Sequence, residues 1–324
     1  LAGPWAGQVL ADLGAEVIKV EAPEGDDTRR WGPPFIDRDG DRSAAYFHAT
    51  NRGKRSVIAD FTTDEGRQIV RDLVAEADVV IENFKLGGLV KYGLDFETLR
   101  ADNPRLIWCS ITGFGQDGPY APRAGYDFLI QGMAGWMDLT GAPDGEPQKV
   151  GIAFADIFTG LYAVIGIQAA LAARAVTGRG QLVDMALLDC AVGVLANQGM
   201  NYLATRQAPR RLGNAHPNIA PYEVLPVADG SIILAVGNDG QFRRFCDVVG
   251  LGALGTDPRF ASNDARVAHR DDLRALLVGA LQVFDKADIL ARLEAAIVPA
   301  GPINAVDEVF ADPQVIARGM QIEA

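Results

Sequence analysis

Cysteine and histidine are scarce in this chain, and their scarcity removes several kinds of site. The 324 residues include only three cysteines and three histidines. Cys109, Cys190 and Cys246 lie far apart and lack CxxC spacing, which fits buried thiols in a reducing compartment better than disulfides or zinc ligands. The isolated histidines disfavour a Ser-His or Cys-His nucleophile.

Positive charge and familiar catalytic motifs are also in short supply. The formal net charge of −12 argues against nucleic acid or an anionic membrane surface as the main partner. The sequence has no GxSxG elbow, no HExxH and no GxxxxGK[ST] loop. It opens without a signal peptide or an initiator Met. We therefore expect a cytoplasmic protein with a trimmed start.

Apolar residues, in contrast, make up 48% of the chain, enough for a sizeable core in one large domain or two. Short apolar stretches typical of strands alternate with helical patterns, the strands being expected at 15–21, 56–61, 78–84, 105–111 and 182–185. This alternation predicts an α/β fold, a parallel sheet covered by helices. Two stretches rich in Gly and Pro, 22–45 and 113–150, are expected to be loops, and the second is long enough to be functional.

A second domain is predicted after a break at 206–218, which is rich in Arg, Pro, Gly and Asn. A hairpin and three helices follow this break. We predict a large α/β domain over 1–205 and a small α+β domain over 219–300, with 301–324 returning toward the first domain.

The first helix and strand also suggest a weaker alternative. A helix over 4–13 followed by a strand that ends on Glu21 is typical of a dinucleotide-binding unit. The segment Gly3-Pro4-Trp5-Ala6-Gly7 does not match GxGxxG, and Pro4 removes a backbone donor. A nicotinamide dehydrogenase is therefore a poor second hypothesis.

The most informative stretch is a nearly uninterrupted apolar run over 157–173, which predicts a buried helix with Asp156 at its start. Its length and its glycines argue against a membrane span. An aspartate here is most often an N-cap that accepts unpaired backbone N–H groups. A desolvated carboxylate among N–H donors is also a suitable nucleophile. Spacing alone does not choose between these roles, which are not exclusive.

Against the acidic background, one set of basic residues falls mostly in loops that follow predicted strands, where open α/β sheets bind ligands. Each one alone is expected to be a solvated surface charge. Together with the turn at Asn83-Phe84 and Gly87-Gly88, where the backbone can approach a ligand closely, they form a candidate cradle for a phosphate-bearing ligand. The set comprises Arg29, Arg30, Arg52, Lys54, Arg55, Lys85 and Lys91.

Several motifs, taken in order, resemble the class III CoA-transferases, the formyl-CoA and carnitine CoA-transferase family. The matching stretches cover nearly the whole chain: LGAEVIKVE, NRGKRS, VIENF, GLDFETLRADNPRLIWCSITGFGQDGP, GYD, ADIFTG, TGRGQ and APYEV. In that family the aspartate of the DxxxG motif is the acyl-accepting nucleophile. The resemblance thus assigns this role to Asp156 and replaces the N-cap interpretation.

The resemblance also implies an architecture. We expect a Rossmann-like parallel-sheet large domain, a smaller α+β domain and an interlocked homodimer. Relatives build the large domain from both chain ends. On that basis this chain is expected to be a fragment without the first strand and the last return segment.

Coenzyme A is the implied substrate, and no metal is implied. Tyr126 would line the acyl pocket, and the residues expected to hold CoA are Arg29, Lys54, Arg55, Asn83, Phe84, Gly88 and Lys91. The expected reaction moves CoA from an acyl-CoA to a free acid through an aspartyl anhydride and an aspartyl-CoA thioester. His216 and the turn at 218–222 resemble members that use small dicarboxylates.

Two alternatives remain open within this resemblance. Related α-methylacyl-CoA racemases carry a histidine near the GYD position, where this chain has Tyr126, and this difference favours transfer over racemisation. A CoA-ester racemase or epimerase, or a non-catalytic CoA-binding relative, stays a competing hypothesis.

Overall fold

The computed structural model describes residues 1–322, and the chain divides into two compact units. The first contains Leu1–Thr140 and Pro147–Pro209, and the second contains Gly141–Glu146 and the chain from Arg210 onward. The change of unit after Pro209 falls inside the predicted break. Residues from 301 to 322 group with the second unit, and their expected return toward the large domain stays a prediction.

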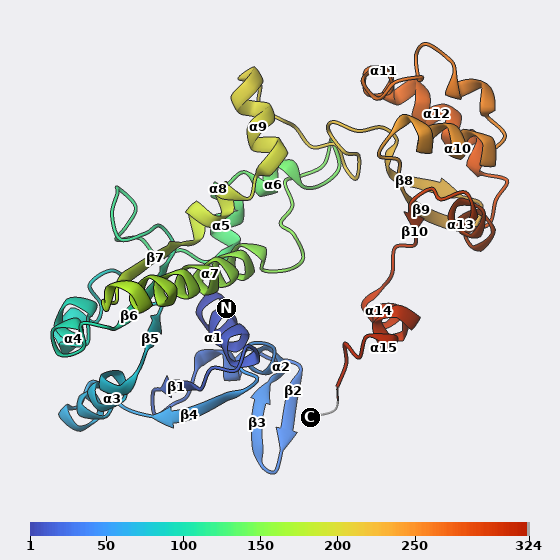
Figure 1. Cartoon of the computed structure of the whole chain (residues 1–324). Helices are drawn as coiled ribbons and strands as arrows, with labels where there is room; N and C mark the ends of the chain where they lie inside the picture. Colours follow the sequence, from blue (N-terminus) through green and yellow to red (C-terminus); the bar gives the residue numbers. More distant parts are fainter. Residues whose placement is uncertain (323–324) are drawn as a thin grey trace. The chain divides into compact units, whose positions relative to one another are not determined.

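The first unit begins with a helix and a small parallel sheet (Figure 1). Strands β1 and β4 pair in parallel, with Val17 opposite Lys54 and Glu21 opposite Ile58. The expectation of a loop over 22–45 was wrong in part, because a 3-10 turn and a polar hairpin without apolar periodicity lie there. The elements are α1 (Ala2–Asp12), β1 (Val17–Glu21), η1 (Asp27–Arg30), β2 (Phe35–Arg38), β3 (Asp41–Ala44), α2 (Ala45–His48) and β4 (Lys54–Ile58).

The rest of the first unit alternates strands and helices, as predicted. Strands β5, β6 and β7 form a second parallel sheet in that order, so the chain has an α/β fold whose parallel pairing occurs in two separate sheets. The elements are α3 (Asp64–Glu76), β5 (Val79–Glu82), η2 (Val90–Tyr92), α4 (Phe96–Asp102), β6 (Ile107–Thr112), α5 (Asp127–Met133), α6 (Trp136–Leu139), α7 (Phe154–Thr177), β7 (Leu182–Ala186), α8 (Leu187–Gly193) and α9 (Ala196–Thr205).

Helix α7 is the central core element of this unit. It packs on β6 and β7 and also against α1 (Figure 1). Gly166 permits the approach to the sheet, because a β-carbon there would lie 2.8 Å from Cγ1 of Val183. By length and composition α7 can cross a membrane, so the argument that this run is too short was wrong. A core helix of a soluble protein passes the same test.

The second unit contains the predicted hairpin and helices. Strands β8, β9 and β10 form an antiparallel sheet in the order β10-β9-β8. Phe242, Phe245, Leu277 and Leu293 are fully buried in the core beside this sheet. The elements are β8 (Tyr222–Val227), β9 (Gly230–Ala235), α10 (Asp239–Val248), η3 (Gly252–Gly255), α11 (Asn263–Ala268), α12 (Arg270–Leu281), α13 (Lys286–Ala295), β10 (Ala300–Gly301), α14 (Val306–Ala311) and α15 (Pro313–Ala317).

Candidate active site

Asp156 lies in the first turn of α7 and is not its N-cap. The helix begins at Phe154, and the N-cap position is occupied by Ala153, which has no capping side chain. The N-cap interpretation of Asp156 is therefore wrong. Its side chain is only 15% exposed, so most of the carboxylate is removed from water without capping its own helix.

The cap of α7 comes from another helix. Oδ1 of Asp127, the first residue of α5, accepts the backbone N–H of Ala155 at 2.9 Å and that of Asp156 at 3.4 Å. Gln131, which is fully buried, donates from Nε2 to the other carboxylate oxygen of Asp127 at 2.7 Å. Oε1 of Gln131 accepts the N–H of Val150 at 2.9 Å. The start of α7 is thus fixed by side chains of α5.

The beginning of α1 lies next to the carboxylate of Asp156. The backbone nitrogen of Leu1 lies 3.7 Å from Oδ2 of Asp156, and the N–H of Ala2 donates to the same carboxylate. A helix N-terminus presents unpaired N–H groups that favour negative charge. Gly160 permits this contact, because a β-carbon there would lie 2.8 Å from the Ala2 carbonyl oxygen.

Burial and neighbouring charge both act on this site. Burial raises the pKa of Asp156, and the carboxylate of Asp127 raises it further, whereas the Ala2 N–H acts in the opposite direction. Burial also raises the pKa of Tyr46 in α2, with the charges of Asp156 and Asp127 adding to the effect. A phenol that keeps its proton can donate a hydrogen bond.

Sequence reasoning did not identify Tyr46 or Asp127 as site residues. Asp127 was visible only as the last letter of GYD, and Tyr46 lies in a short helix that the sequence did not predict. The Tyr46 ring packs against Trp31, with the ring centroids 5.3 Å apart. No periodicity marks such residues, because their roles depend on which helices pack at the start of α7.

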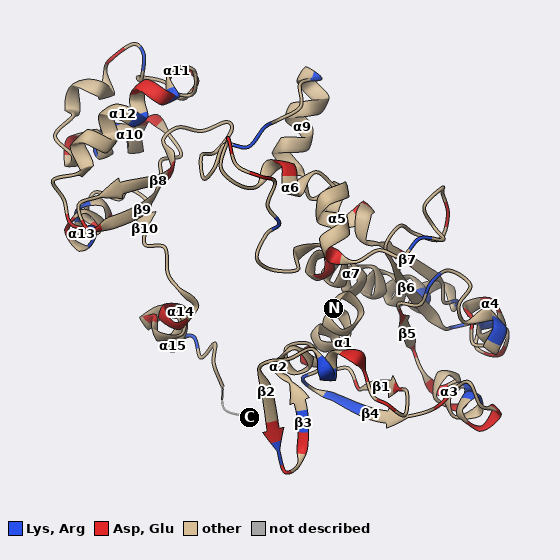
Figure 2. Ribbon diagram, turned by 180° about the vertical axis from the view of Figure 1, so that it is seen from behind, with Lys and Arg blue, Asp and Glu red and all other residues tan. Residues whose placement is uncertain are grey.

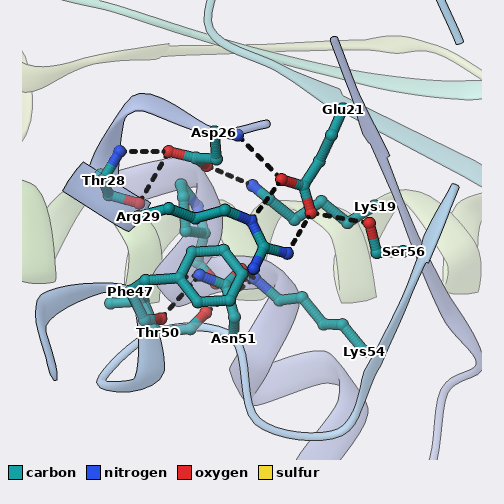
Figure 3. Close-up of polar contacts among 11 residues, drawn as sticks. Lys19, Glu21, Asp26, Thr28, Arg29, Phe47, Thr50, Asn51, Lys54 and Ser56 are labelled. Atoms are coloured by element: carbon teal, nitrogen blue, oxygen red, sulfur yellow. Dashed lines mark hydrogen bonds and ion pairs between the residues drawn. The ribbon is translucent and has the colours of Figure 1, made fainter. Parts of the chain in front are cut away.

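Two of the residues expected to hold CoA are engaged inside the first unit (Figure 3). Arg29 makes a paired contact with Glu21, from Nε to Oε2 and from Nη2 to Oε1, each at 2.8 Å. Its guanidinium also stacks over Phe47, 3.9 Å from the ring centroid. The Arg29 hydrogen bond is the main cause that lowers the pKa of Glu21, to about 2.

Lys54 is the second of these internal cations. Its Nζ donates to the carbonyl oxygens of Pro4 and Thr50, both at 2.7 Å, and to Oδ1 of Asn51 at 2.9 Å. Burial, with the charge of Lys19 adding, lowers its pKa to about 7. Lys54 thus ties the first turn of α1 to the turn that precedes β4.

Arg55 differs from both, because its side chain is 78% exposed and its contact is with Glu16, itself largely exposed, at 2.8 Å. The start of β4, where Lys54 and Arg55 lie, is coloured as a positive segment in Figure 2. Of these three residues, Arg55 is the one whose charge is open to solvent.

A cavity of about 240 Å³ follows β5, and its lining includes Phe84, Gly88, Trp108 and Gln116. The turn is tight at Gly88, whose N–H donates to the Lys85 carbonyl oxygen at 2.7 Å. Two of the seven residues expected to hold CoA, Phe84 and Gly88, therefore line one hollow. Asn83 and Lys91, which flank the hollow in sequence, are exposed.

The remaining predicted residue, Tyr126, immediately precedes α5 and is 73% exposed. It is adjacent in sequence to Asp127, which touches the start of α7. Within residues 1–322, no group of three or more His, Cys, Asp or Glu side chains has the arrangement of a metal site.

The chain matches known proteins over its full length. The model of CoA-transferase family III matches residues 1–324. Succinate–glutarate CoA-transferase of Agrobacterium fabrum is 62% identical over 100% of this chain and 82% of its own. Succinyl-CoA:glutarate CoA-transferase of Mus musculus is 40% identical over 100% of this chain and 73% of its own.

A solved structure agrees with these sequence matches. The crystal structure of a CAIB/BAIF family protein from Brucella suis has a TM-score of 0.89 and 69% identity, covering 99% of this chain and 85% of that one. With an α/β fold, a desolvated aspartate in its DxxxG motif and these matches, the chain belongs to CoA-transferase family III and is a CoA-transferase.

Proposed function

We propose that this protein moves CoA from a small dicarboxylic acyl-CoA to a free dicarboxylic acid, with Asp156 as the nucleophile. The observation that carries the proposal is the largely buried Asp156 carboxylate, which faces the N–H groups at the start of α1. The substrate class is supported by the succinate–glutarate and succinyl-CoA:glutarate transferases to which the chain is similar.

In the first half-reaction, a carboxylate oxygen of Asp156 attacks the thioester carbonyl carbon of the donor. The carbon–sulfur bond breaks, CoA leaves as a thiolate, and a mixed anhydride forms on Asp156. The thiolate then attacks the aspartyl carbonyl carbon of this anhydride. The donor acid is released as a carboxylate, and Asp156 is left as a CoA thioester.

The second half-reaction runs in the opposite order. The acceptor carboxylate attacks the aspartyl thioester carbonyl, displacing CoA thiolate and forming a new mixed anhydride. The thiolate attacks the acyl carbon of the acceptor, which leaves as its CoA ester and restores the Asp156 carboxylate. No net proton, oxidant or water is consumed, and water must be excluded because it would hydrolyse the anhydride.

The surrounding groups have defined tasks in this scheme. The N–H of Ala2 and the phenol of Tyr46 donate hydrogen bonds to negative charge that develops on oxygen. Tyr126 lines the acyl pocket. The residues that hold CoA are Phe84 and Gly88, which line the cavity after β5, and Asn83 and Lys91, which flank it in sequence. Arg55 binds the phosphates, and Arg29 and Lys54, which are held by internal contacts, complete the set.

The assembly and location belong to the same proposal. We propose an interlocked homodimer, supported by large apolar side chains left exposed on α7 (Leu161, Ile165, Val176) and on α9 (Met200, Leu203). The cytoplasm is the proposed compartment, on the basis of the scattered cysteines. Nucleic acid and membranes are not proposed partners, given the net charge of −12.

The test is an assay of the purified protein with succinyl-CoA and glutarate, read by mass spectrometry for glutaryl-CoA and succinate. Wild type is expected to form both products in equal amounts and to carry a hydroxylamine-sensitive CoA adduct on residue 156. No transfer across a panel of dicarboxylic acids would overturn the substrate class. Exchange of the α-proton of an acyl-CoA with deuterium, without transfer, would identify a racemase instead.

A further inference from the structure

The carboxylate of Asp127 contacts the backbone of Asp156, and its two oxygens have different partners. One oxygen accepts the N–H groups of Ala155 and Asp156 at 2.9 and 3.4 Å. The other oxygen accepts from the buried Gln131 at 2.7 Å. Ala153, at the N-cap, supplies no capping side chain, so Asp127 does for α7 what an N-cap aspartate normally does.

This cap acts on the residue that reacts. The N–H of Asp156 belongs to the same residue as the nucleophilic carboxylate, so a bond to that N–H fixes the backbone from which the side chain projects. A displacement of about 1 Å at a reacting group can slow a reaction on the order of a hundredfold. Because the cap comes from α5, it also fixes the position of the nucleophile relative to Tyr126, the proposed acyl-pocket residue that precedes α5.

Asp127 also brings a negative charge toward Asp156. The groups close to Asp156 are the Leu1 nitrogen and the Ala2 N–H at the start of α1 and the carboxylate of Asp127 on α5. Tyr46 on α2 senses the same two carboxylates, because their charges raise its pKa. Of these groups, only Asp127 carries a like charge. When Asp156 is acylated it becomes neutral, and the repulsion between the two carboxylates is relieved.

We propose that Asp127 is a positioning residue for the transfer reaction. It fixes the nucleophile Asp156 through the first-turn amides of α7, and its negative charge destabilises the free carboxylate of Asp156 before acylation. This inference rests on the proposed role of Asp156. Asp127 does not touch the substrate in this scheme and forms no bond to it.

The test compares two variants that separate the cap from the charge. Asp127→Asn keeps one carbonyl oxygen able to accept from Ala155 and removes the negative charge, whereas Asp127→Ala removes both. Asp312→Asn is the matched control, because Asp312 caps α15 through a similar pair of amides, Gln314 at 2.8 Å and Val315 at 3.3 Å.

For Asp127→Ala we expect kcat to fall roughly ten- to a hundredfold with little change in KM for the acyl-CoA. For Asp127→Asn we expect a smaller fall in kcat and a displacement of the acid limb of the pH profile toward lower pH. The sign follows from the charge: without the like charge, Asp156 loses its proton at a lower pH. The Asp312→Asn control is expected to leave both quantities unchanged.

The outcomes distinguish this inference from the proposed function. Absence of transfer, or of a CoA adduct on residue 156, in the wild type would overturn the function itself. With wild type active, an unshifted acid limb in Asp127→Asn would overturn the inference. It would also be overturned if the loss in Asp127→Ala disappeared once activity was corrected for the folded fraction, measured by thermal unfolding.

Discussion

A β-carbon on Gly160 would lie 2.8 Å from the carbonyl oxygen of Ala2 and 3.1 Å from the Trp5 ring, so α1 and α7 are in backbone contact at this point. The glycine of the DxxxG motif is therefore a packing residue. It lets the N–H groups at the start of α1 reach the carboxylate four residues earlier in the same motif.

The variant Gly160→Ala should separate these helices. We expect a loss of stability of about 1–3 kcal/mol from overpacking, and a fall in kcat larger than the folded fraction explains, because Ala2 moves away from Asp156. Gly279→Ala in α12 is the control, since nothing lies within 4 Å of a β-carbon there. Urea unfolding and kcat are measured on both. Normal turnover in a stable Gly160→Ala protein would contradict this role for the glycine.

The variant Asp156→Asn separates stability from chemistry. The folded protein raises the pKa of Asp156 above its unfolded value, so this carboxylate lowers stability once the pH rises past the unfolded pKa. Asn cannot ionise, and we expect a melting temperature at neutral pH equal to or above that of the wild type. We also expect turnover to fall by more than about a thousandfold, since an amide cannot form the anhydride. Turnover close to wild type would eliminate Asp156 as the nucleophile.

The pair of Glu21 and Arg29 predicts a specific acid sensitivity. The pKa of Glu21 is lowered from its ordinary value of 4.5 to about 2, mainly by the Arg29 hydrogen bond. The contribution of Glu21 to folding stability is therefore complete above pH 4.5 and is lost as the pH falls toward 2. We expect Glu21→Gln to be less stable than wild type by about 1–3 kcal/mol at pH 7. The difference should shrink as the pH drops from 4.5, measured by urea unfolding. The exposed Glu65→Gln serves as the control, and a gap independent of pH would refute the prediction.

The contacts to CoA are expected to depend on the exposed cations. Arg55→Ala and Lys91→Ala should each weaken CoA binding by on the order of 1 kcal/mol, and the effect should fade with added salt. The exposed Arg38→Ala, on the β2–β3 hairpin, is the control for loss of general charge. Isothermal titration at low and high salt measures all three. Equal affinities for the three variants and wild type at low salt would remove Arg55 and Lys91 from the site.

The exposed apolar side chains of α7 and α9 predict self-association. Sedimentation equilibrium at micromolar concentration should give the mass of a dimer, because these faces otherwise leave large apolar groups in water. Ile165 is 61% exposed, and Ile165→Asp should weaken the dimer while Val283→Asp, at an 80% exposed position of the second unit, should not. A folded wild-type monomer would rule out the dimer.

The sequence by itself determined the order of the helices and strands and the candidate nucleophile, Asp156. Apolar periodicity is a local property, so β5, α3, β6 and the β8–β9 hairpin were found within a few residues of their observed bounds. The motif ADIFTG identified Asp156 because its resemblance to the family is carried by consecutive residues. Composition and resemblance were enough for the fold class and the family.

Only the tertiary structure decided which polar groups meet. Lys54 is bound to Pro4, 50 positions away in the chain, and Asp127 caps a helix that begins 27 residues after it. These pairs depend on which elements pack together in the folded chain. A buried charge binds an acceptor that packing brings close to it, because an unpaired buried charge is costly. For the same reason the hairpin in 22–45 was missed, since its polar strands are stabilised by their neighbours and not by a pattern of their own.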